Sequence, residues 1–176
     1  MNKRLLNRDA IYRNRVEQLL RELEPVDTPV LNMAAIDGGW SAIQIMHHLM
    51  LSEELALKYV RKKLSFNQDL KKAGFDAYWR DRVLWLYLNL PFKFRAPEAV
   101  NAEKLPGFAT LAETRDRWLA IRLEWADFLK QLPNDVFDKA VYRHPIAGRL
   151  SWSGTLKFFQ YHFNRHRKQI NRTLGK

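Results

Sequence analysis

Residues 41–64 read SAIQIMHHLMLSEELALKYVRKKL and carry the start and stop signals of a complete helix. Ser41 is followed three positions later by Gln44, which is the pattern of a capping box that satisfies unpaired backbone amides. The basic run at 61–63 complements the negative end of a helix dipole. We therefore predict a helix from about Ala42 to Leu64.

Four further segments show apolar residues at helical spacing. Thr110 and Glu113 repeat the capping-box pattern, and Ser151 is a suitable N-cap. The predicted helices cover Leu5–Leu23, Asp76–Leu90, Thr110–Leu132 and Trp152–Arg172. We expect a loop over Pro91–Gly107, a turn over His144–Gly148, and no strands, because no segment alternates convincingly. The chain is thus predicted to be all-α, with four long helices and one extra helix.

The helix expected at 76–90 is apolar on nearly all sides toward its C-terminal end. A helix without a polar face is usually buried, either within its own chain or against a second subunit. A buried strand is the alternative interpretation of the same run.

The composition of the 176 residues suits one globular domain spanning 1–176, with 47% hydrophobic residues and no long biased tract. The absence of cysteine excludes disulfides, thiolate metal ligands and a cysteine nucleophile. Any thiol chemistry would therefore need a thiol supplied by a small molecule.

The formal net charge is +11, which favours an anionic partner: a nucleic acid, a membrane surface or an acidic small molecule. After Asp138 there is no acidic residue, although basic residues continue to the end of the chain. The start of the chain lacks the apolar core of a signal peptide, and the run 83–90 is far shorter than the roughly 18 residues of a membrane span. We expect a cytoplasmic protein with no membrane association.

His162 and His166 are four positions apart, so a helix would stack their side chains on one face, one turn apart. Two imidazoles placed in this way can share one metal ion at about 2.0–2.1 Å. The alternative is a pair of partly exposed histidines that form hydrogen bonds with their neighbours. The glutamate of the metalloprotease helix motif is missing between them, which excludes that class.

His47 and His48 are adjacent, and their side chains would point about 100° apart on a helix. Only one of them can face the bundle core in line with another ligand. The polarity of the neighbouring residues does not decide between the two.

Two stretches resemble motifs of the DinB/YfiT-like superfamily. The first runs from Trp40 to Leu49 and on to Glu53, and the second combines HPIAGRL at 144–150 with His162 and His166. The resemblance implies a four-helix bundle that is often dimeric, so we expect a homodimer. It also implies a divalent ion, nickel or zinc among others, held by three histidines.

Carried over position by position, the ligands implied by the resemblance are His48, His162 and His166. The match of Trp40 to the family's tryptophan selects His48 over His47. His144 matches the family's His-Pro turn, to which we assign a structural role.

Relatives in this family include transferases and isomerases that use low-molecular-weight thiols such as bacillithiol or mycothiol. The resemblance therefore implies a metal-dependent S-transferase or hydrolase acting on a small, anionic substrate, with such a thiol as a cosubstrate. The alternative is a non-catalytic metal-binding or nucleic-acid-binding helical protein. In that case the basic residues of the last helix would contact phosphates; they are Arg165, Arg167, Lys168 and Arg172.

Glu53 lies five positions after His48, which points it about 140° away on a helix. We therefore predict that it pairs with a basic residue of a neighbouring helix. Tyr161 and Gln169 are candidate pocket residues, and no residue stands out as a general base.

Overall fold

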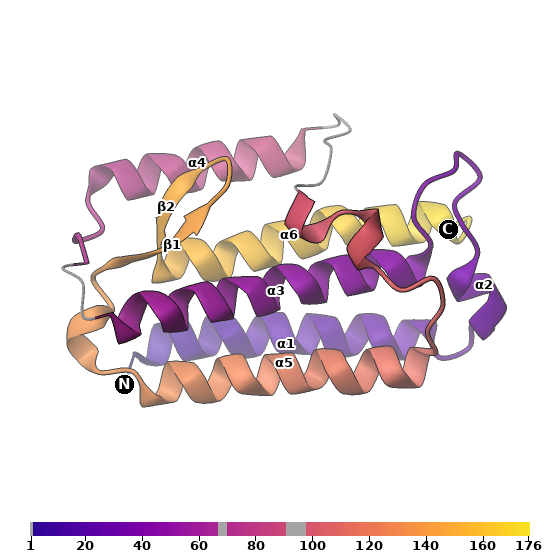
Figure 1. The fold of residues 1–176 in the computed structure, drawn as a ribbon, viewed down its shortest axis with the longest axis horizontal. Coiled ribbons are helices and arrows are strands. Elements are labelled where there is room, and N and C mark those ends of the chain that lie inside the picture. Colours follow the sequence, from indigo (N-terminus) through magenta and orange to yellow (C-terminus); the bar gives the residue numbers. More distant parts are fainter. Residues whose placement is uncertain (1, 67–69, 91–97) are drawn as a thin grey trace.

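The structure is a computed structural model that describes residues 2–66, 70–90 and 98–176. Four long helices lie side by side and form a bundle (Figure 1). They are α1 (Lys3–Leu23), α3 (Ala42–Ser65), α5 (Leu111–Gln131) and α6 (Trp152–Thr173). The bundle confirms the predicted all-α fold class, and the bounds of its four helices agree with the sequence pattern to within two residues.

The order of the helices around the bundle differs from their order in the chain. Both α1 and α3 pack against α5 and α6, so α1 and α3 occupy opposite corners. In Figure 1, α3 and α5 run in one direction while α1 and α6 run in the other. The connection from α3 to α5 must therefore return along the length of the bundle. It contains α4 (Phe75–Asn89) and the short 3₁₀ turns η1 (Glu98–Val100) and η2 (Ala102–Lys104).

The predicted helix caps are present. The Ser41 hydroxyl accepts a hydrogen bond from the backbone N–H of Gln44 at 3.2 Å, and the Gln44 side chain accepts one from the Ser41 N–H at 3.1 Å. Thr110 and Glu113 form the same reciprocal pair at the start of α5. Ser151 caps α6. Because each cap depends on residues within one turn, the local sequence alone specifies where these helices begin.

The expectation of no strands was wrong. A hairpin of β1 (Ala140–His144) and β2 (Gly148–Ser151) precedes α6, and its turn is the predicted His-Pro turn. The Nδ1 atom of His144 accepts hydrogen bonds from the backbone N–H groups of Ile146 and Ala147 at 3.2 and 3.1 Å. Buried and exposed residues do not alternate strictly along either strand, so the sequence lacks the pattern by which strands are recognised. The short helix α2 (Thr28–Asn32) was also not predicted.

Helix α4 lies outside the bundle, against α6 and β2 (Figure 1). Its helical state contradicts the alternative of a buried strand. Leu84 and Leu88 are buried, whereas Trp79, Val83 and Leu86 are between 53% and 57% exposed. The helix therefore buries one side within its own chain, and the expected homodimer stays a prediction. The first part of the expected loop, 91–97, lies outside the described residues.

None of the helices within the described ranges combines the length and the hydropathy that crossing a lipid bilayer requires.

A charged network crosses the bundle core. Arg122 of α5 is fully buried and forms ion pairs with Asp9 of α1 and with Glu53 of α3. Glu53 also accepts hydrogen bonds from the Tyr12 hydroxyl at 2.6 Å and from the Trp118 indole at 3.0 Å. These contacts confirm that Glu53 pairs with a basic residue on a neighbouring helix.

Burial raises the pKa of Asp9, although the neighbouring Arg122 opposes this shift. Burial alone would lower the pKa of Arg122, but the carboxylates of Glu53 and Asp9 outweigh it and raise that pKa. The guanidinium therefore keeps its charge in the core, where it is stable only as long as both carboxylates are present.

Replacing Arg122 by Met should destabilise the fold strongly, because it leaves two buried carboxylates without their partner. We expect the free energy of unfolding to fall by about 3–5 kcal/mol, measured by urea denaturation at pH 7. Arg115→Met is the matched control, because Arg115 pairs with Glu24 at the partly exposed surface. That variant should lose less than about 1 kcal/mol. Equal losses in the two variants would contradict a central role of the buried network.

Candidate metal centre

The structure brings His48, His162 and His166 together. His48 lies on α3, and the other two lie one turn apart on the adjacent, antiparallel α6. One nitrogen from each imidazole falls within 4.8 Å of the other two. The Nε2 atoms of His48 and His162 are 3.1 Å apart. No aspartate or glutamate of the described residues joins this group.

The three imidazoles are neutral at physiological pH. His48 and His162 are 4% and 9% exposed, and His166 is the most exposed of the three. Burial lowers the pKa of His48. Burial, with the neighbouring His166 and His48, holds the pKa of His162 well below its usual range. Burial and His48 lower the pKa of His166 to about 3. Each ring can therefore offer a nitrogen lone pair, which a metal ion requires.

Hydrogen bonds that the Nδ1 atoms donate orient two of the rings. His48 Nδ1 lies 2.9 Å from the carbonyl oxygen of Val100 in η1, and His166 Nδ1 lies 2.8 Å from Oε1 of Gln169. Because both partners are oxygens that accept, each Nδ1 carries the proton and each Nε2 is left with its lone pair. Histidine ligands of metals are commonly oriented in this way.

Aromatic rings pack against the outer sides of the histidines. The indole of Trp40 lies 4.9 Å from the ring of His48, and Phe158 stacks on His162 at 5.2 Å with an angle of 16°. These rings keep water from two sides of the cluster, which lowers the local dielectric constant. Trp40 was singled out by the sequence motif, whereas neither Phe158 nor the Val100 carbonyl carried a signal.

His47 lies outside the cluster and faces α5. Its Nε2 atom is 3.3 Å from the hydroxyl of Thr114. Burial, together with the nearby charge of Arg117, lowers the pKa of His47 to about 4. The fold thus brings His48, and not His47, to the pair on α6.

The geometry fits a divalent metal ion. A tetrahedral ion bound at 2.0–2.1 Å would separate two ligand nitrogens by about 3.3 Å, close to the 3.1 Å between the Nε2 atoms of His48 and His162. Three imidazoles and no carboxylate suit zinc or nickel better than calcium or magnesium. Three ligands also leave a coordination position open. The role of the three histidines as metal ligands stays a prediction.

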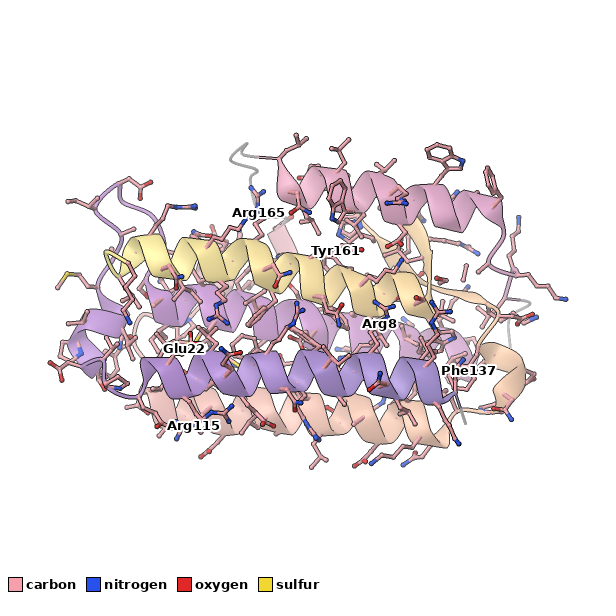
Figure 2. The ribbon with its side chains drawn as sticks, turned by 180° about the vertical axis from the view of Figure 1, so that it is seen from behind. Arg8, Glu22, Arg115, Phe137, Tyr161 and Arg165 are labelled. Atoms are coloured by element: carbon pink, nitrogen blue, oxygen red, sulfur yellow. The ribbon has the colours of Figure 1, made fainter. Side chains whose placement is uncertain are left out.

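Two of the four basic residues named above as candidate phosphate contacts have structural partners. Arg165 lies on the edge of α6 that faces α4 (Figure 2) and donates to the carbonyl oxygens of Leu88 at 3.2 Å and Leu90 at 2.9 Å. Arg167 pairs with Glu22 of α1 at 2.7 Å. These two cations stabilise helix packing, which reduces the share of the last helix that is available to an anionic substrate.

The two other candidate pocket residues differ in position. Gln169 contacts His166, as described above. Tyr161 lies on the side of α6 toward α4, near Arg165 (Figure 2).

The comparisons with known proteins agree with this architecture. No curated protein matches the chain. Among solved structures, the chain is similar to YfiT from Bacillus subtilis, a probable metal-dependent hydrolase with an unusual four-helix bundle topology. The two are 18% identical with a TM-score of 0.58, over 99% of this chain and 90% of that one, so the likeness shows the fold alone. The family model of the DinB superfamily matches residues 10–170, which confirms the resemblance, and the chain therefore belongs to the DinB superfamily.

Proposed function

We propose that the protein is a metalloenzyme that holds one divalent ion, zinc or nickel, through His48, His162 and His166 and acts on a small molecule. The observation that carries this proposal is the set of three neutral imidazole nitrogens within 4.8 Å, with no acidic residue of the described chain among them. The likeness in fold to YfiT, described as a probable metal-dependent hydrolase, supports the same class of activity.

A divalent ion held by these three histidines would lower the pKa of a bound water or thiol and so would supply a nucleophile near neutral pH. The protein's part is to hold three neutral nitrogens in place, through the hydrogen bonds to Val100 and Gln169. The packing of Trp40 and Phe158 excludes water from the flanks.

Two nucleophiles are consistent with this site. Water needs no further component, so hydrolysis is the first candidate reaction. A low-molecular-weight thiol is the second, and it must come from outside because the chain has no cysteine. The positive charge of the protein favours an anionic thiol or an acidic substrate.

The metal content of the purified protein tests the site. We expect about one zinc or nickel ion per chain, and loss of most of it in His162→Ala, which removes one of three ligands. His47→Ala is the matched control, because this adjacent histidine faces Thr114 and lies outside the cluster. Metal content should be measured by mass spectrometry and unfolding by circular dichroism. Equal metal content in the wild type and a folded His162→Ala variant would refute the site.

The nucleophile is identified by assaying the metal-loaded protein on a panel of esters, amides and alkylating electrophiles, with and without an added thiol. Turnover without thiol would establish hydrolysis, and turnover only with thiol would establish transfer. In either case His162→Ala should lose at least about a hundredfold in kcat/KM, because the activating ion is lost. Activity that is unchanged after removal of the metal by a chelator would refute a metal-dependent reaction.

The metal-free protein should lose stability on acidification. Burial lowers the pKa of His144 to about 4 and is the main cause that lowers that of His166 to about 3, whereas the unfolded chain has ordinary histidines. Below about pH 6.5 the unfolded state therefore binds more protons than the folded state, and stability falls. From pH 7.5 to 5.5, above the carboxylate range, we expect a loss of about 1 kcal/mol per buried histidine in urea denaturation. His166→Gln should lose less over this interval. A constant or rising stability would contradict neutral buried histidines.

A further inference from the structure

The hairpin places two arginines opposite each other. In the antiparallel register of β1 and β2, Arg143 pairs directly with Arg149. Like charges at directly opposed positions destabilise an antiparallel pair. Between described residues, no hydrogen bond or ion pair joins either guanidinium group to an acidic side chain. The arrangement is therefore suited to an anion that neutralises both groups at once.

Two other segments bring further cations to the same place. Arg80 of α4 donates from Nη1 to the carbonyl oxygen of Arg149 at 3.3 Å, which fixes its guanidinium beside the hairpin. The segment before α4 pairs with the start of β1, where the N–H of Ala140 donates to the carbonyl oxygen of Lys71 at 2.9 Å. These backbone contacts hold Lys71 and Lys72 at the base of the hairpin.

The three segments enclose a pocket of about 640 Å³, which we call the hairpin pocket. Its charged lining residues are Lys71, Lys72, Asp76, Arg80, Arg143 and Arg149. The one carboxylate, Asp76, already pairs with Arg80 at 3.2 Å, and Lys72 lies 3.9 Å from Asp138 outside the lining. Five cations against one acid leave the pocket with a strong positive excess.

We propose that the hairpin pocket binds the phosphoryl groups of a small phosphorylated molecule. The planar fork of an arginine donates two parallel hydrogen bonds to a phosphate, and three arginines converge here from α4, β1 and β2. The volume lies in the range of about 300–1,000 Å³ that is typical of small-molecule sites. A nucleic-acid surface would instead spread its cations along a track that follows the backbone.

The hairpin pocket is separate from the metal centre. None of the three clustered histidines lines it. Phe158 of α6 lies between the two sites: its ring contacts that of His144 in β1 at 4.6 Å and stacks on His162 at 5.2 Å. The phosphoryl site goes beyond the proposed metal chemistry, and each can be tested without the other.

The test is calorimetric binding of inorganic pyrophosphate at low, constant ionic strength. We expect a 1:1 complex, and at least about tenfold weaker binding in the double variant Arg143→Gln/Arg149→Gln. The control Arg4→Gln/Lys58→Gln removes the same net charge from two exposed positions outside the pocket. It should bind as the wild type does. Because the substitutions relieve like-charge repulsion, the pocket variant should melt at or above the wild-type temperature and keep its metal content.

Three results would overturn the proposal. The first is no binding of pyrophosphate to the folded wild type. The second is equal weakening in the control, which would show that net charge alone attracts the anion. The third is tight binding of a short single-stranded DNA, lost in the pocket variant, without pyrophosphate binding, which would make this face a contact for a nucleic-acid backbone. If the double variant fails to fold, Lys71→Gln replaces it, with a smaller expected loss of affinity.

Discussion

A charged guanidinium in the middle of an apolar bundle is tolerated only when carboxylates surround it, and Arg122 meets this condition through Asp9 and Glu53. These ion pairs join α5 to α1 and α3, so three helices cannot slide past one another without leaving a buried charge unpaired. The fourth helix, α6, is connected to this network through Tyr12, which donates a hydrogen bond to Glu53. The ring of Tyr12 contacts that of Phe163 on α6, with 5.7 Å between the ring centroids. This contact holds His162, which precedes Phe163, at the level of His48 on α3.

The parts of the site that depend on neighbours in sequence could be predicted. Ser151 caps α6 through the first turn of that helix, and the spacing of four positions from His162 to His166 is enough to stack them on one face. The choice between His47 and His48 could not be made from neighbours in sequence, because the two residues have similar surroundings on their helix. It depends on where α6 lies against α3, a contact more than a hundred residues apart in the chain. The resemblance to the family motif selected His48, which local periodicity could not do.

Other features had no signal that could be read locally. The hairpin strands span five and four residues, and their pairing is supported by α4, which lies some sixty residues earlier. The partner of His48 is the backbone carbonyl of Val100, a group that every residue type possesses. The direction of Glu53 was predictable from helix geometry, but its partner Arg122 follows 69 positions later, and only the tertiary fold identifies it. Sequence patterns thus predicted the helices and the helix face on which a residue lies. Which residues contact one another was determined by tertiary packing.

The parallel course of α3 and α5 has a consequence for how such proteins can diversify. Because α3 has 24 residues, the connection to α5 must travel back over about 36 Å, and its helix α4 lies outside the four-helix bundle. Longer surface connections cost little conformational entropy, so this segment can change in length and sequence while the bundle is preserved. It also carries the carbonyl that orients His48 and the cations beside the hairpin. Natural or engineered exchange of this one segment would change what the protein recognises and leave its scaffold intact.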